Sequence, residues 1–151
     1  MKLQKNEIAE IEISYRPAIS DNPIINSSID GYNIVLPFFP ESTIALQEKF
    51  VVIYLNRGNR VLGVYELSIG GISGTVADPK LIIGVALKIA ASGIILCHNH
   101  PSGNLQPSSS DRQLTDKIRS ACVFFDIKLI DHLILSPNQT FISFRDEGFI
   151  S

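Results

Sequence analysis

The sequence predicts a single domain of the α/β or α+β sandwich class. Its 151 residues are about the length of one domain. The composition, 45% hydrophobic and 19% charged, is that of a globular protein. Apolar, β-branched segments of strand length alternate along the chain with segments that have helix-start signals and helical periodicity. Elements of both kinds in this order pack as layers around a core.

The net charge, the lengths of the apolar runs and the number of cysteines together limit the function classes, while a local basic patch remains open. Lys and Arg number 13 against 15 Asp and Glu, for a net charge of −2, so overall electrostatics give no argument for nucleic-acid or acidic-membrane binding. No apolar run reaches the roughly 18–20 residues that cross a bilayer, and the first ten residues lack the apolar segment of a secretion signal. Two cysteines cannot build a disulfide framework. We therefore expect a cytoplasmic protein with no membrane partner.

Residues 1–44 are predicted to form an N-terminal arm. Apolar and polar residues alternate over 9–15, as in a half-buried strand. Residues 27–36 are expected to form a short helix that ends before Pro37. Such a strand would lie at a sheet edge or contact a second copy, which is compatible with a homodimer.

Residues 45–151 are predicted to form the main domain. A turn cluster at 56–59 joins two strands in a β-hairpin. The pair Asp78–Pro79 is a helix start, with Asp as the N-cap and Pro at the first helical position. The expected elements are strands 50–55 and 61–69, a helix from 79 that Gly93 ends, strand 94–97, a helix opened by Ser108, and strands 128–135 and 140–144.

Candidate metal ligands gather after the strand 94–97. His98 and His100 are two residues apart at its end, so in extended chain both imidazoles point to one side. Asp111 lies in the first turn of the next helix, and a loop rich in Pro, Gly and Ser is long enough to fold it back. Two imidazoles and a carboxylate form a three-ligand set for Zn²⁺ with the fourth position open to water, the pattern of a catalytic site. Zinc lowers the pKa of such a water to about 7.

Two further residues are candidates for the chemistry. Glu66 lies in the predicted strand 61–69, where a carboxylate could move protons, although it could also be an ordinary exposed strand residue. Ser108 could donate a hydrogen bond to a developing oxyanion. Ser108 and Asp111 also fit a helix capping box, and the two interpretations of Ser108 are compatible.

The motif His98–x–His100–Pro101, six residues, then Ser108–x–x–Asp111 resembles the JAMM (JAB/MPN) zinc-metalloprotease motif. The longer segments HNHPSGNLQPSSSDRQLTDKI and GVYELSIGGISGTVADP resemble the JAB-type domain of the RadC family. The resemblance covers about residues 45–145.

The resemblance implies a single three-layer α/β/α sandwich of the cytidine-deaminase type, with a mixed sheet. Residues 45–151 would be this RadC-like JAB/MPN domain, preceded by the strand-containing arm 1–44. The resemblance implies zinc ligands at His98, His100 and Asp111, a catalytic acid/base at Glu66 and an oxyanion partner at Ser108.

Two functional hypotheses follow. The first is a zinc-dependent metallohydrolase of the JAMM type that cleaves a peptide, isopeptide or related amide bond. The alternative is a RadC-like accessory protein of DNA repair or recombination, which binds a partner or DNA while zinc serves its structure. The net charge of −2 argues against strong binding of DNA by this chain alone. A metal-binding but catalytically idle fold is a third interpretation.

Two other features have simpler interpretations. Asp131 and His132 interrupt an apolar strand and are interpreted as a structural hydrogen-bonded pair, with support of the metal ligands or of a substrate as the alternative. Cys97 and Cys122 are interpreted as core residues.

Overall fold

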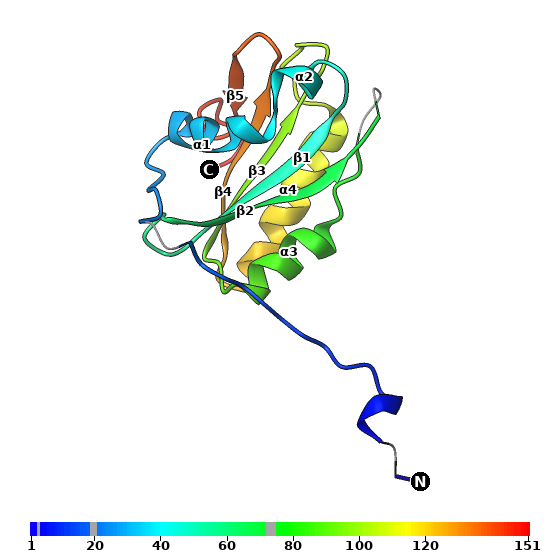
Figure 1. Cartoon of the computed structure of the whole chain (residues 1–151). Helices are drawn as coiled ribbons and strands as arrows, with labels where there is room; N and C mark the ends of the chain where they lie inside the picture. Colours follow the sequence, from blue (N-terminus) through cyan, green and yellow to red (C-terminus); the bar gives the residue numbers. More distant parts are fainter. Residues whose placement is uncertain (3, 19–20, 72–74) are drawn as a thin grey trace.

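A mixed sheet of five strands forms the middle of the molecule in the residues that this computed structural model describes, which are 1–2, 4–18, 21–71 and 75–151 (Figure 1). The strand order is β2-β1-β3-β4-β5. Strands β3 and β4 are parallel, and the other neighbours are antiparallel. The elements are η1 (Lys5–Glu7), α1 (Ser28–Val35), η2 (Leu36–Phe38), α2 (Glu41–Ile44), β1 (Lys49–Leu55), β2 (Val61–Ile69), α3 (Pro79–Lys88), β3 (Gly93–Asn99), α4 (Ser109–Val123), β4 (Lys128–Leu135) and β5 (Phe141–Ser143).

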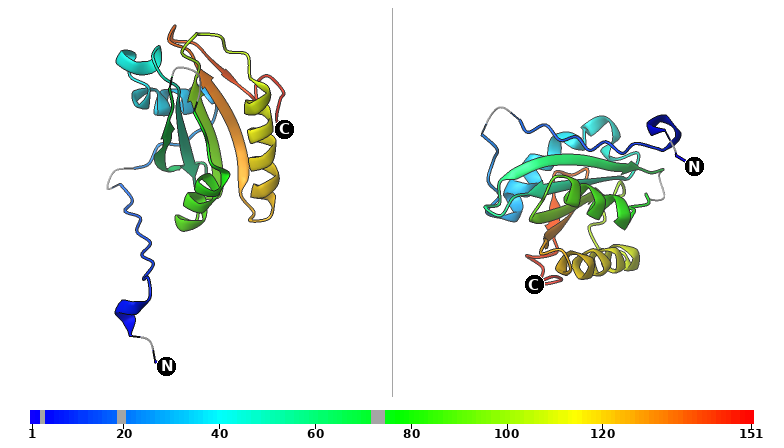
Figure 2. Two further views of the ribbon diagram at one scale, coloured as in Figure 1. Left: turned by 90° about the vertical axis from the view of Figure 1, so that its right-hand side faces the viewer. Right: turned by 90° about the horizontal axis from the view of Figure 1, so that it is seen from below.

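Helices cover both faces of the sheet, with α1 and α2 on one face and α3 and α4 on the other (Figure 2). Alternate residues of β1 fill the two cores because side chains alternate along a strand. The core beneath α1 and α2 takes Val51, Ile53 and Leu55, and the core beneath α3 and α4 takes Phe50, Val52 and Tyr54. Cys97 and Cys122 lie one in each core, as interpreted from the sequence. The three-layer α/β/α class is thus confirmed.

The helix starts follow the predicted caps. The Asp78 side chain accepts a hydrogen bond of 2.9 Å from a backbone N–H in the first turn of α3. Helix α3 ends five residues before Gly93, where the sequence predicted its end, because Ala90 takes the left-handed conformation at φ 53°. Gly93 instead begins β3. A Cβ there would lie 2.5 Å from the end of the Ile130 side chain, so glycine allows the two strands to pack without displacing it.

One extra residue in β4 decides which of its side chains face which layer. Ile95 of β3 pairs with Asp131 rather than with Ile130, which is passed over in the ladder. Asp131 therefore shares the face of Ile95, beneath α1 and α2. His132 pairs with Leu96 and shares its face, beneath α3 and α4.

The arm does not form the strand predicted over 9–15. No ladder partner is found for this segment in the described part of the chain, and Ile11 and Ile13 are 85% and 61% exposed. An alternating segment becomes a stable strand only when a partner edge takes its hydrogen bonds and covers its apolar face. Residues 4–18 lead away from the sheet (Figure 1), although the Tyr15 hydroxyl donates to the Leu62 carbonyl at 2.5 Å. The short predicted helix does form, as α1.

Among the residues described, no helix combines the length and the apolar content needed to span a membrane.

Candidate metal centre

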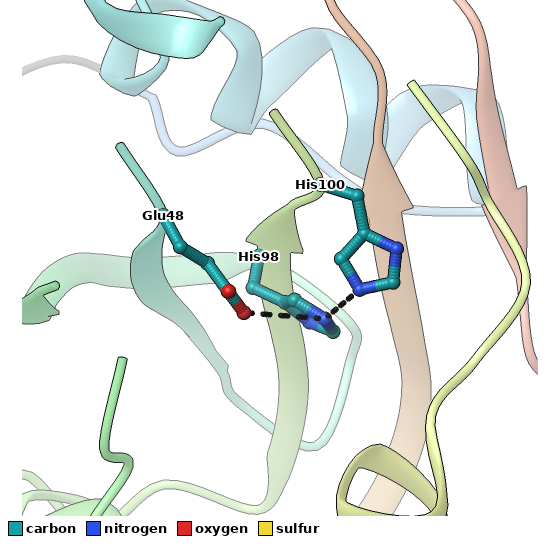
Figure 3. Close-up of side chains that lie close together, drawn as sticks. All are labelled: Glu48, His98 and His100. Carbon is teal, nitrogen blue, oxygen red and sulfur yellow. Dashed lines mark hydrogen bonds and ion pairs between the residues drawn. The ribbon is translucent and has the colours of Figure 1, made fainter. Parts of the chain in front are cut away.

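The candidate ligands meet at the carboxyl end of β3. His98 pairs across the ladder with Phe50, whose side chain lies in the core beneath α3 and α4, so His98 faces that layer. The crossover helix α4 begins nearby and brings Asp111 in its first turn. Figure 3 shows Glu48 and the two histidines pointing toward one another.

The three ligands predicted from the sequence come together at distances that suit zinc. The His98 and His100 Nε2 atoms are 3.0 Å apart. One Asp111 carboxylate oxygen lies 3.3 Å from the His98 Nε2, and the other lies 3.3 Å from the His100 Nε2. Atoms bonded to a tetrahedral zinc at about 2.0–2.1 Å are separated by about 3.3–3.4 Å. The donor set therefore fits this ion in both chemistry and spacing.

In the neutral His100 ring, the lone pair rather than the proton faces the centre. The Nδ1 of His100 lies 2.6 Å from the Asn104 carbonyl oxygen. A carbonyl oxygen only accepts, so this Nδ1 carries the proton, and the neutral ring has its lone pair at Nε2. The Nε2 in turn faces Asp111, whose ionised carboxylate is also an acceptor. Acceptors held this close require a metal ion or a proton between them.

The pKa shifts show the same attraction for positive charge. The hydrogen bond with Asp111 raises the pKa of His100, although burial opposes this shift. Burial alone would raise the pKa of Asp111, but hydrogen bonds with His100 and His98 outweigh it and lower that pKa well below its usual value. Both shifts reflect the attraction between the imidazoles and the Asp111 carboxylate.

Ser108 orients Asp111 through the capping box that the sequence predicted. The Ser108 hydroxyl oxygen accepts from the Asp111 N–H at 3.0 Å, and the Ser108 N–H donates to the Asp111 carboxylate at 2.8 Å. The hydroxyl proton is not used by these contacts.

Glu66 does not reach the histidines. It pairs with Val51, whose side chain lies beneath α1 and α2, so it lies on the face of the sheet opposite to His98. Its carboxylate is 2.9 Å from the Lys49 Nζ, and its side chain is 48% exposed. Successive side chains of a strand point to opposite faces of the sheet, so a shift of one residue in the position of Glu66 would have placed it on the His98 face. The structure does not support Glu66 as the acid/base of this centre.

Glu48 is the carboxylate that the structure brings to the histidines instead. It directly precedes β1, and its Oε1 lies 3.9 Å from the His98 Nε2 (Figure 3). Ligand atoms of Glu48, His98 and His100 lie within 4.8 Å of one another, so this group could hold a metal ion. Burial raises the pKa of Glu48, while the nearby histidines oppose the shift. The sequence could have indicated Glu48 through its position just before β1, because the start of β1 lies beside the end of its antiparallel partner β3.

Asn99, between the two histidines, points the other way and fixes the segment that carries Glu48. Its Nδ2 donates to the carbonyls of Ile44 at 2.8 Å and Gln47 at 3.0 Å. Its Oδ1 accepts from the Lys49 N–H at 2.8 Å. The His–Asn–His tripeptide thus places two candidate ligands on one face of the sheet, while Asn99 holds the segment before β1 on the other face.

We expect Asn99→Asp to destabilise the metal-free protein by about 2–3 kcal/mol, because an oxygen would replace the Nδ2 that faces two carbonyls. Urea unfolding measures this loss. The matched control is Asn104→Asp, since the Asn104 side chain is exposed and uses only its oxygen, toward the Gln106 N–H. Equal stability of the two variants would contradict the role given to Asn99.

His132 and Asp131 do not form a side-chain pair. Asp131 accepts from the backbone N–H groups of His132 at 2.7 Å and Arg145 at 3.0 Å, and from the Ser143 hydroxyl at 2.5 Å. Asp131 is therefore structural, as interpreted from the sequence. The His132 imidazole lies on the other face of the sheet, 2.8 Å from the His98 ring.

Fold and site together define an α/β domain with a candidate metal centre at a strand end. Comparison with known proteins gives its family: residues 25–149 match the model of the RadC-like JAB domain, and the chain belongs to this family. The resemblance seen in the sequence is thereby confirmed.

Curated relatives support this assignment. A UPF0758 protein of Flavobacterium johnsoniae is 44% identical over 124 residues, which are 82% of this chain and 52% of that protein. A UPF0758 protein of Porphyromonas gingivalis is 37% identical over 146 residues, 95% of this chain and 63% of that protein. A UPF0758 protein of Aquifex aeolicus is 39% identical over 104 residues, 69% of this chain and 45% of that protein. The chain thus matches about half the length of these relatives, whose names state no activity.

Proposed function

We propose that this chain is a zinc-dependent hydrolase that cleaves amide bonds of the peptide or isopeptide kind. The observation that carries the proposal is the placement of a further carboxylate, that of Glu48, beside the three-residue donor set. Glu48 lies next to His98 yet farther from it than Asp111 does. Such an arrangement suits a group that moves protons at a metal centre rather than one more ligand.

His98, His100 and Asp111 would hold the metal. A zinc ion bound there would supply a water of lowered pKa and would polarise a substrate carbonyl. The choice of zinc rests on the donor set, since two imidazoles and one carboxylate are typical of its catalytic sites.

Glu48 would act as the general base and then as the general acid. Burial raises its pKa toward the range in which a carboxylate both accepts and returns a proton efficiently. It would take a proton from the attacking water and deliver it to the nitrogen of the leaving amine. Its partly buried position, with the side chain 18% exposed, keeps that proton close to the reacting atoms.

Ser108 would stabilise the negative charge that develops on the carbonyl oxygen. Its hydroxyl oxygen accepts from the Asp111 N–H, so its own proton is available to be donated. The capping box would hold the hydroxyl in place through the reaction, and one residue would thus serve both the helix start and the chemistry.

The test is cleavage of a peptide library that contains both ordinary peptide bonds and lysine isopeptide bonds, with new amines detected by mass spectrometry. We expect stoichiometric zinc in the purified protein and cleavage that a chelator abolishes and zinc restores. Protein that binds stoichiometric zinc but cleaves neither bond would contradict the hydrolase proposal. That result would favour the accessory role in DNA repair or recombination, for which salt-dependent DNA binding is the measurement.

A further inference from the structure

A third imidazole, that of His132, lies behind His98 on the side away from the metal centre. The His132 Nε2 lies 2.8 Å from the His98 Nδ1, and the His132 Nδ1 lies 2.7 Å from the Thr115 hydroxyl. All three side chains are buried, with His132 fully shielded from solvent. The Thr115 hydroxyl also lies 2.7 Å from the Asp111 carbonyl oxygen, one turn earlier in α4.

The Asp111 carbonyl oxygen, at one end of this chain of hydrogen bonds, determines which group donates in each of them. The Asp111 carbonyl cannot donate, so the single hydroxyl proton of Thr115 points to it. The Thr115 oxygen must then accept from the His132 Nδ1–H. A neutral His132 with its proton at Nδ1 has a lone pair at Nε2, which accepts from the His98 Nδ1–H. The proton of His98 is thereby held on the side away from the centre.

We propose that His132, supported by Thr115, is a positioning residue that holds His98 in the tautomer whose Nε2 can bind a metal ion. With the opposite direction of these bonds, the His98 Nε2 would carry a proton and could not act as a ligand. The inference rests on the proposed metal-binding role of His98 and does not depend on hydrolysis. It assigns a role to His132 that the sequence left open.

Aromatic neighbours pack against the His98 and His132 rings and hold their orientation. The Phe144 ring stacks on His132 with centroids 4.5 Å apart, and the Phe50 ring stacks on His98 at 5.6 Å. The Thr115 oxygen on one side of His132 and the His98 Nδ1–H on the other are the partners that a neutral ring fits. A neutral ring is able to accept from His98, whereas an imidazolium is not.

The first test is the histidine ¹⁵N–¹H spectrum of the full chain, with and without zinc. The protein has three histidines, so single variants assign the signals. We expect a proton on Nδ1 of both His98 and His132 and none on Nε2 of His132, under both conditions. A proton on the His132 Nε2 would overturn the proposal, and the decisive spectrum is that of the unsubstituted protein.

The second test compares zinc affinity in two variants by competition with a chromophoric chelator. His132→Leu leaves the His98 Nδ1–H without an acceptor, and we expect zinc to bind roughly tenfold to hundredfold more weakly. His132→Gln offers a carbonyl oxygen near the position of Nε2 and should restore most of the affinity. The packing control is Phe144→Leu, which loosens the same ring without removing a hydrogen bond. Affinity unchanged in folded His132→Leu, or equally reduced in Phe144→Leu, would overturn the proposal.

The two proposals fail in different ways. Zinc binding with the expected tautomers but without amide cleavage would support the positioning role and contradict the hydrolase. If the wild-type chain bound no zinc, the metal-centre proposal would fail, and this inference would fail with it.

Discussion

Glu48→Gln is expected to lower the rate of amide cleavage about a hundredfold to ten-thousandfold while zinc still binds stoichiometrically. The amide has nearly the shape of the carboxylate but cannot take a proton from water or return one to the leaving amine. The carboxylate lies 3.9 Å from the His98 Nε2, farther than the 3.3 Å of Asp111. Turnover of the library-derived substrate and metal content of the same samples are the measurements.

The matched control is Glu66→Gln, the same chemical change on the opposite face of the sheet. It alters only a partly exposed ion pair with Lys49, so we expect cleavage and zinc content to be unchanged. The reverse pattern, an inactive Glu66→Gln and an active Glu48→Gln, would contradict the assignment of the acid/base. Loss of zinc in Glu48→Gln would instead make Glu48 a ligand.

Asp111→Asn should remove the stabilisation that zinc gives to the fold. A metal that binds only the folded chain stabilises it by about 4 kcal/mol at a thousandfold excess over its Kd. For a domain of this size that corresponds to a rise in Tm of roughly 10 °C. The neutral amide is a poor zinc ligand, and it no longer balances positive charge at the two imidazoles. Thermal unfolding with zinc and with a chelator measures the difference.

Asp116→Asn is the control for this second experiment. Asp116 lies on the same helix, but its side chain is exposed rather than turned to the histidines. The variant should keep the full zinc-dependent rise in Tm. A rise that survives in Asp111→Asn would place the metal elsewhere.

The meeting of the three candidate ligands was predictable from sequence because local rules govern the position of each of them. His98 and His100 share a face through the two-residue period of a strand, and the capping pattern around Ser108 fixes where Asp111 lies in its helix. The short loop between them limits how far apart they can be. No long-range pairing had to be known.

The choice between Glu48 and Glu66 could not be made from local sequence rules. The choice between them depends on the register of β1 against both neighbours, which is set by pairings across the sheet. A prediction made from the strand alone could place Glu66 in the strand that pairs with β1 but could not tell which face of the sheet it occupies.

Two other differences between the prediction from sequence and the structure also arise from contacts between residues far apart in the chain. The alternating segment 9–15 has a strand pattern but no ladder partner among the residues that the structure describes. His132 faces His98 only because Ile130 is passed over in the ladder with β3, and a bulge of this kind leaves no signature in the apolar pattern. Helices α1 and α4, the start of α3 and the other strands, whose caps and turns are local, form close to where they were predicted, whereas the short helix α2 was not predicted.

The bulge in β4 also sets the electrostatic character of the centre. In a regular ladder Asp131 would pair with Leu96 and stand behind His98, giving the carboxylate–histidine arrangement common in zinc proteins. The extra residue substitutes an uncharged ring for that anion. A divalent ion at this site would therefore be less neutralised by its surroundings and would act as a stronger Lewis acid.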